Sequence, residues 1–142
     1  MADAKSLSRD LFAAVASGDI ETIRQICDPA VVLVEAGGTY RGIGAVADHF
    51  RAISSPMPDC AIDVQRQIVE GDTVVTEMRF TGTQTAPMTT PEGVLPPSGR
   101  RVDVPGCVVH VIRDSRITKH TGYYDQMLFL GQLGLLPQPA QS

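Results

Sequence analysis

The stretch from Arg100 to Pro137 reads RRVDVPGCVVHVIRDSRITKHTGYYDQMLFLGQLGLLP. It holds two β-branched runs, 100–112 and 116–124, which are separated by the turn Asp114-Ser115 and followed by a short apolar tail. This order predicts an antiparallel hairpin and then a short helix from Gln126 to Gly131. Within sixteen residues the stretch also gathers most of the proton-transfer groups of a chain that has three histidines and three tyrosines: His110, His120, Tyr123, Tyr124 and Asp125. If the protein catalyses a reaction, we therefore expect the reacting side chains to lie in this stretch.

The residues before this stretch predict three helices and three further strands. The helices are expected from about Leu7 to Ser17, from Asp19 to before Pro29, and from about Gly44 to before Pro56. The strands are expected at 30–34, 60–69 and 73–85, with Cys60, Ile62, Val64 and Ile68 on one covered face. A Pro- and Gly-rich connection, 88–99, suits a hairpin tip or lid.

Three helices followed by a four-stranded antiparallel meander predict an α+β fold, with helices on one side of a curved sheet. At 142 residues, and with no internal repeat, the chain is expected to form a single domain over residues 1–142. The net charge of −4 and the absence of a dense Lys/Arg run argue against a nucleic-acid partner.

The N-terminal residues contain no apolar run of signal-peptide length, and nothing in the sequence indicates a membrane partner. The cysteines, Cys27, Cys60 and Cys107, are odd in number and widely spaced, which is typical neither of zinc ligands nor of a disulfide framework. We therefore expect a cytoplasmic protein with reduced cysteines.

The order of elements, together with FTGTQT, PPSGRRVDVPG, RITKHTGYYD and QLGLLP, resembles the SnoaL-like polyketide cyclases. These belong to the superfamily of cone-shaped α+β folds that includes ketosteroid isomerase and limonene-epoxide hydrolase. The resemblance implies a curved antiparallel sheet that encloses an apolar pocket with three N-terminal helices. It also implies a small hydrophobic ligand, no metal, no cofactor, and a homodimer.

The chain departs from the family's pattern at two positions. The usual His-Trp-Asp stretch is here His120-Thr121-Gly122, so glycine stands where the family has its catalytic Asp. The usual Gly-Thr-His is Gly82-Thr83-Gln84, which puts an amide in the place of a histidine. Asp125 matches a second Asp of the family at the end of the strand.

Four candidate site residues lie in the last two strands and just after them. His120 is the first candidate for acid/base catalysis, the alternative being a partly exposed strand histidine. Asp125 is either a second base or the N-cap of the following helix. Tyr124 shares the strand phase of His120 and is the better candidate for an oxyanion donor, so Tyr123 is expected to face the other way. His110 either reaches the cavity or is a satisfied core histidine.

The remaining candidates lie elsewhere in the chain. Gln84 is expected to orient a ligand carbonyl, since it cannot carry a proton. Glu35, at the end of an apolar run, would supply a carboxylate in place of the missing Asp, with Tyr40 nearby; exposure in a loop is the alternative for both. Gly122 would enlarge the pocket.

These features lead to one main hypothesis and two alternatives. The main hypothesis is a cofactor-independent polyketide cyclase-like enzyme that closes a ring by acid/base catalysis. The first alternative is a hydrolase or isomerase of the epoxide-hydrolase kind, and the second is a non-catalytic protein that binds a small molecule.

Overall fold

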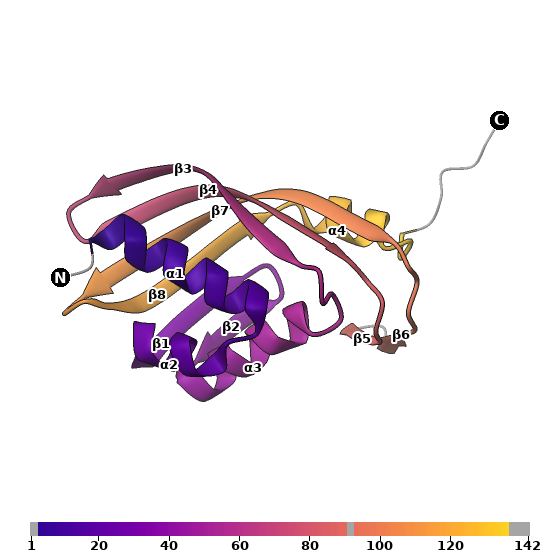
Figure 1. Cartoon of the computed structure of the whole chain (residues 1–142), viewed down its shortest axis with the longest axis horizontal. Helices are drawn as coiled ribbons and strands as arrows, with labels where there is room; N and C mark the ends of the chain where they lie inside the picture. Colours follow the sequence, from indigo (N-terminus) through magenta and orange to yellow (C-terminus); the bar gives the residue numbers. More distant parts are fainter. Residues whose placement is uncertain (1–2, 91–92, 137–142) are drawn as a thin grey trace.

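Six strands form the main sheet, in the order β2-β1-β8-β7-β4-β3, in a computed structural model that describes residues 3–90 and 93–136 (Figure 1). The strands are β1 (Cys27–Glu35), β2 (Gly38–Arg41), β3 (Ala61–Glu70), β4 (Thr73–Thr83), β7 (Arg101–Arg113) and β8 (Arg116–Tyr124). From β3 to β8 the strands form the antiparallel meander that the sequence predicts, and the α+β class is confirmed.

Strand β1 changes the topology that the sequence predicts. It pairs with β8 in parallel, with Leu33 beside His120 and Val34 beside Thr121, and it pairs antiparallel with the short strand β2. The sheet is therefore not purely antiparallel. An apolar run indicates a strand but not its partner, and the four residues of β2 are too few for a periodic signal. The parallel pairing brings the end of β1 next to the second half of β8.

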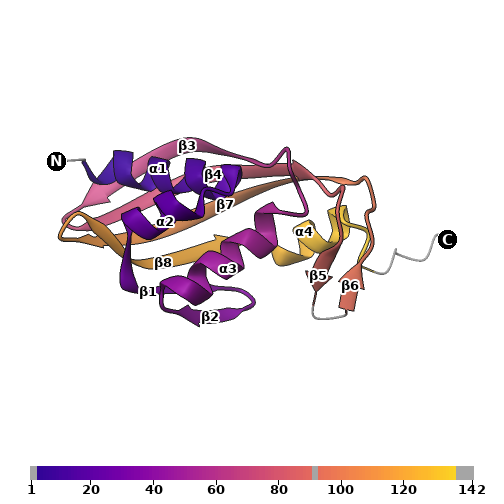
Figure 2. The same cartoon turned by 60° about the horizontal axis from the view of Figure 1, so that its bottom comes forward.

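Helices cover the inner face of the sheet, as Figures 1 and 2 show. They are α1 (Ala4–Ser17), α2 (Ile20–Ile26) and α3 (Ile43–Ser54), with α4 (Gln126–Gln132) at the far end of β8. Asp3 and Asp19 cap α1 and α2, and Gly18 ends α1 with the left-handed φ of 71° that glycine adopts without strain. The three N-terminal helices are confirmed, and so is the short helix after Asp125.

The core lies between these helices and the sheet. Its fully buried members include Leu11, Ile23, Val31, Leu33 and Ile117. Helix α4 is tied to the sheet by the amide of Gln132, which accepts a hydrogen bond from the backbone N–H of Asp103 (2.7 Å) and donates one to its carbonyl (3.0 Å). This connection places α4 across the end of the inner face.

Strand β3 departs from the predicted alternation. Its register shifts between Val64 and Arg66, which is a β-bulge. After the bulge Gln67 faces inward and donates to the Lys5 carbonyl at 3.1 Å, while Ile68 is 52% exposed. One extra residue moves every later side chain to the other face, so the expectation that Ile68 is covered is wrong.

The connection between β4 and β7 forms a second, two-stranded sheet from β5 (Met88–Thr90) and β6 (Gly93–Leu95). Figure 2 shows this hairpin at the same end of the molecule as α4. The sequence predicts a connection here but not its strands, which are three residues long.

The three cysteines are free, and burial raises the pKa of the Cys27 thiol to about 12, which keeps it un-ionised. In the described part of the chain, none of the helices has the length and apolar character needed to cross a membrane.

Candidate active site

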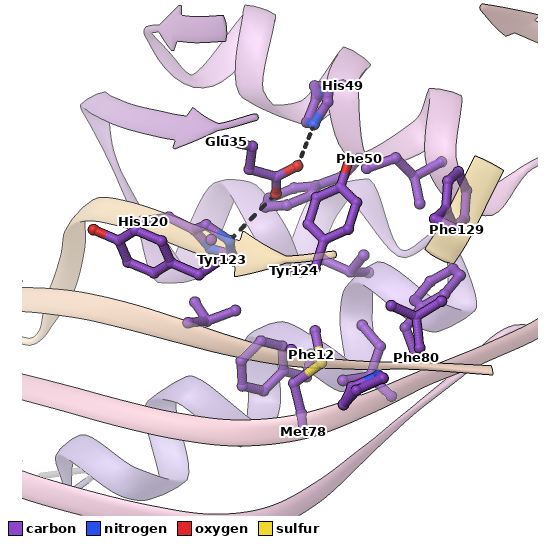
Figure 3. Close-up of a pocket in the computed structure, with 18 residues that line it drawn as sticks. Phe12, Glu35, His49, Phe50, Met78, Phe80, His120, Tyr123, Tyr124 and Phe129 are labelled. Atoms are coloured by element: carbon purple, nitrogen blue, oxygen red, sulfur yellow. Dashed lines mark hydrogen bonds and ion pairs between the residues drawn. The ribbon is translucent and has the colours of Figure 1, made fainter. Parts of the chain in front are cut away.

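A cavity of about 160 Å³ lies between the inner face of the sheet and the helices. Most of its wall is apolar, and its larger contributors are Phe12, Phe50, Met78, Phe80, Val104 and Phe129. The ionisable side chains that border it include Glu35, His49, His120 and Tyr124, which come from β1, α3 and β8 (Figure 3). The pocket is therefore apolar with one polar wall.

Glu35 is the centre of this polar wall. It ends β1, and its side chain is only 13% exposed. Oε2 accepts a hydrogen bond from His49 Nε2 at 3.1 Å, and Oε1 lies 3.7 Å from His120 Nε2. Figure 3 shows the carboxyl group between the two imidazole rings. The sequence-based alternative of an exposed loop position for Glu35 is therefore wrong, because β1 continues to this residue and β8 flanks it.

Gly122 makes room for this carboxyl group. A Cβ atom at position 122 would lie 3.1 Å from Glu35 Cγ and 3.2 Å from Oε1, closer than ordinary van der Waals contact. The side chain of Glu35 thus fills space that a side chain on β8 would otherwise occupy. Gly122 also borders the cavity, as expected.

His120 and His110 form a buried pair across β7 and β8. They are directly opposite each other in the sheet, and His110 Nε2 lies 2.9 Å from His120 Nδ1. Ser8 Oγ on α1 lies 2.8 Å from His110 Nδ1. The pKa of each imidazole is lowered from 6.5 to about 3, mainly by burial; for His120 the neighbouring His110 contributes to the shift and Glu35 opposes it. Both rings are therefore neutral near pH 7.

The two histidines occupy different places relative to the cavity. His120 borders it and is 4% exposed, so the alternative of a partly exposed strand residue is wrong. His110 is fully buried behind His120 and does not border the cavity, which confirms the alternative of a satisfied core histidine.

Tyr124 borders the cavity next to Glu35. Burial raises the pKa of its phenol, and Glu35 and Tyr40 raise it further, so the hydroxyl keeps its proton and remains a donor. Tyr123 also borders the cavity, although the alternation along the strand predicts that only one of the two does. Its side chain is 62% exposed, and Figure 3 shows its ring directed away from that of Tyr124.

His49 is a site residue that the sequence patterns did not predict. Its ring is stacked on Tyr40, with centroids 4.1 Å apart and planes 25° apart. Tyr40 itself does not border the cavity; it contacts the ring of His49 and also helps to raise the pKa of Tyr124. His49 follows Val46 by three residues and precedes Ile53 by four, which places it beside the predicted inner face of the helix. That spacing was a usable signal.

Gln84 does not border the cavity. It is fully buried, and its amide N–H groups donate to the carbonyls of Ala86, Leu95 and Pro96. Its amide oxygen accepts from the backbone N–H and the hydroxyl of Ser98. These partners use the whole amide, so Gln84 anchors the connection that carries β5 and β6 and lies outside the cavity wall where the sequence places it.

Asp125 is the N-cap of α4. Its carboxylate accepts a hydrogen bond from the backbone N–H of Leu128 at 3.0 Å, and it does not border the cavity. The capping alternative for Asp125 is therefore confirmed, and β8 runs to Tyr124 without the bulge that would turn Asp125 inward.

A second, more open cavity of about 290 Å³ borders the same carboxyl group. It is lined by residues 34–36 and 121–124, which begin at the last pair of β1 with β8, Val34 and Thr121, and continue beyond it. Glu35 and Gly122 contribute to both cavities. Glu35 therefore borders a cavity on each of two sides.

Two histidines and a glutamate meet at this wall. Even so, the described residues contain no group of three or more His, Cys, Asp or Glu side chains arranged to hold a metal ion. The two oxygens of Glu35 face different histidines, so the three side chains do not converge on one point.

The SnoaL-like domain model matches residues 8–120, which is most of the chain, and the chain therefore belongs to the SnoaL-like family. No curated protein sequence matches it significantly.

Solved structures of similar proteins cover nearly the whole chain. A candidate SnoaL-like polyketide cyclase from Jannaschia sp. CCS1 superposes with a TM-score of 0.83 at 22% identity, over 94% of this chain and 93% of its own. TsrD from Streptomyces laurentii gives 0.80 at 27% identity, over 93% and 95%. IdmH from Streptomyces antibioticus, a candidate polyketide cyclase, gives 0.79 at 27% identity, over 94% and 99%. The cone-shaped fold is thus confirmed.

Proposed function

We propose that the protein is a cofactor-independent acid/base enzyme of the cyclase or isomerase type, and that Glu35 is its proton-transfer residue. The observation that carries this proposal is the position of the Glu35 carboxyl group over Gly122, on the polar wall of an apolar cavity. Glycine stands where the family has its catalytic Asp, and the carboxyl group of a neighbouring strand fills the space. In this protein the base thus lies on β1, whereas in the family it lies at the position of Gly122 on β8.

The geometry suits removal of a proton from carbon. A C–H acid is deprotonated by a base within hydrogen-bond reach, and the Glu35 carboxyl group borders the cavity directly. The hydrogen bond from His49 holds one oxygen in place, which leaves Oε1 as the oxygen nearer to His120. A fixed carboxylate loses little entropy on reaching the reactive geometry.

The enolate that forms needs a hydrogen-bond donor, and the same wall supplies one. Tyr124 borders the cavity and carries a hydroxyl that stays protonated. Donors already in place in a dry cavity stabilise a developing oxyanion strongly. In this proposal the ring of neutral His120 faces the Glu35 carboxyl group, and the proton transfer falls to Glu35.

The cavity wall and the related proteins support a substrate class. The aromatic and aliphatic lining fits a hydrophobic molecule with activated C–H bonds, such as a poly-β-carbonyl chain. The similar proteins from Jannaschia and Streptomyces antibioticus are candidate polyketide cyclases. We therefore propose intramolecular ring closure of a polyketide-like substrate as the reaction.

The first test needs only the chemistry of proton removal. A hydrophobic 1,3-dicarbonyl compound is incubated in D₂O with the protein, and exchange of its acidic C–H is followed by proton NMR. We expect the wild type to accelerate exchange and Glu35→Gln to lose about a hundredfold or more of the acceleration. The matched control is Glu70→Gln, at the exposed end of β3, which should exchange at the wild-type rate.

Two results would contradict the proposal. Equal exchange by wild type and folded Glu35→Gln would show that another group takes the proton. Binding of the probe without any acceleration, as measured by calorimetry, would instead favour the non-catalytic alternative.

The second cavity favours one further candidate function. Because it borders Glu35 from the more open side, it offers a route for water to the same carboxylate. A carboxylate that activates water would open an epoxide by hydrolysis. Incubation with a hydrophobic epoxide in H₂¹⁸O tests this: a labelled diol that Glu35→Gln does not form supports hydrolysis, and an unchanged epoxide contradicts it.

A further inference from the structure

His110 is a buried titratable residue that the proposed function does not use. Its ring is fully buried, and both of its nitrogens have a hydrogen-bond partner. We propose that His110, held by Ser8, is a positioning residue that keeps His120 in the tautomer with its proton on Nε2, directed at the Glu35 carboxyl group. For its catalytic consequence this inference rests on the proposed function, whereas the tautomer itself does not.

The charge of the Glu35 carboxylate determines which nitrogen of His120 carries the proton. An ionised carboxylate only accepts hydrogen bonds, and Glu35 Oε1 faces His120 Nε2 at 3.7 Å. If Nε2 carried no proton, its lone pair would face a negative oxygen, which is repulsive. The proton of neutral His120 therefore lies on Nε2, and Nδ1 is an acceptor.

The rest of the chain of hydrogen bonds is then determined. His120 Nδ1 accepts from His110 Nε2 at 2.9 Å, so His110 also carries its proton on Nε2. His110 Nδ1 must accept, and the Ser8 hydroxyl donates to it at 2.8 Å. A hydroxyl rotates to suit its partner, so Ser8 satisfies the last acceptor of the series. The N–H of His120 Nε2 is directed at Glu35 Oε1 at 3.7 Å, a charge–dipole contact that is longer than a hydrogen bond.

The fold fixes the two rings in this arrangement. His110 and His120 are opposite each other in the register of β7 and β8, and their ring planes cross at 63° with centroids 4.7 Å apart. Phe12 packs on His110 and Phe50 on His120, each with ring centroids 5.4 Å apart. The rings therefore cannot turn to exchange partners without displacing the helices α1 and α3.

Removal of the N–H donor at position 110 is expected to release His120 from its tautomer. Without it, His120 Nδ1 has no partner, and the ring is free to move its proton to Nδ1. The Nε2 lone pair would then face Glu35, and the carboxyl group would move away from its position over Gly122. His110 thus acts on the reaction through His120, without touching the substrate.

The test is ¹⁵N NMR of the histidine rings in the ligand-free wild-type protein at pH 7. Long-range ¹H–¹⁵N correlations distinguish a protonated ring nitrogen from an unprotonated one. We expect His110 and His120 both to be neutral with the proton on Nε2. A proton on Nδ1 of either ring would overturn the inference, and this measurement needs no variant to fold.

Two variants of similar size separate positioning from packing. His110→Gln keeps an N–H donor at the distance of Nε2, whereas His110→Met fills the space without one. We expect His120 to keep its tautomer in the glutamine variant and to become a mixture in the methionine variant, with proton exchange at least about tenfold slower than wild type only in the latter. Equal spectra and rates in both variants would overturn the inference. If the Glu35 proposal is wrong, exchange by the wild type is either absent or unchanged in Glu35→Gln, while the tautomer result still stands.

Discussion

The carboxyl group of Glu35 lies where a side chain at position 122 would begin: a Cβ atom on Gly122 would be 3.1 Å from Glu35 Cγ. The two residues belong to different strands, β1 and β8, which pair in parallel up to Val34 and Thr121. A glycine on one strand and a carboxylate on the next therefore make one complementary pair. In the proposed function, this relationship lets Glu35 take the place of the Asp that the family resemblance leads one to expect at position 122.

His49 is predicted to hold the Glu35 carboxylate in its reactive position. His49→Leu removes the hydrogen bond to Oε2, so the proton-exchange rate should fall roughly ten- to a hundredfold, because small misplacements of a catalytic group are costly. His49→Gln keeps a donor and should recover much of the rate. Tyr40→Leu, which removes only the ring stacked on His49, serves as a control and should have a smaller effect than His49→Leu. A wild-type rate in folded His49→Leu would contradict this role.

Asp125 is predicted to contribute stability and not catalysis. Asp125→Ala removes the side chain that accepts from Leu128 and should lower the free energy of unfolding by about 1 kcal/mol, while Asp125→Asn, itself a good N-cap, should cost less. Urea unfolding measures both. A large loss of exchange rate at unchanged stability would show that the carboxylate takes part in the reaction after all.

The stability of the fold is predicted to decrease on mild acidification. His110 and His120 have pKa values of about 3 in the fold and about 6.5 when unfolded, because burial disfavours the imidazolium. The unfolded chain therefore binds more protons between these values. Stability is full above about pH 6.5 and falls toward pH 3, by at most about 1.4 kcal/mol per pH unit for each ring.

The helix caps do not obscure this effect. Hydrogen bonds from Ser6 and Thr22 lower the pKa of Asp3 and Asp19 below 3.8, so their contribution is lost only in stronger acid. Urea unfolding at about pH 7, 6 and 5 thus reports mainly on histidine. His110→Met should give a shallower dependence than wild type, and a wild-type stability that is constant over this interval would contradict the buried, neutral state of the pair.

The parts of the fold that the sequence predicts well are those with regular periodicity. The helices around Leu11 and Phe50 and the antiparallel strands from β3 to β8 repeat apolar residues at 3.6 or 2 positions, and burial of one face follows directly. The bulge after Val64 could not be predicted, because the extra residue shows only in the pairing of β3 with β4 and the sequence of β3 carries no mark of it. The parallel partner of β1 lies almost ninety residues away, beyond any local signal.

The candidate site was predictable to a similar extent. Four of the predicted residues border the cavity: His120, Tyr124, Gly122 and Glu35. They could be predicted because the alternation along β8 and the end of the apolar run of β1 can be recognised from neighbouring residues alone. Gln84 could not be placed from sequence, since its partners lie in an irregular connection with no pattern of its own. His49 lies on the inner side of α3 with Phe50, and its helical spacing from Val46 and Ile53 could have identified it, but the prediction for this helix used its apolar residues alone.

The most direct test of the account exchanges the carboxylate between the two strands. The measurement is the rate of C–H exchange of the 1,3-dicarbonyl probe by wild type, Glu35→Ala, Gly122→Asp and the double variant. Glu35→Ala should lose about a hundredfold or more, and Gly122→Asp should be impaired because two carboxyl groups would crowd one space. The account predicts that the double variant, with its carboxylate back on β8, is at least about tenfold faster than Glu35→Ala. A wild-type rate in Glu35→Ala, or a folded double variant no faster than Glu35→Ala, would contradict it.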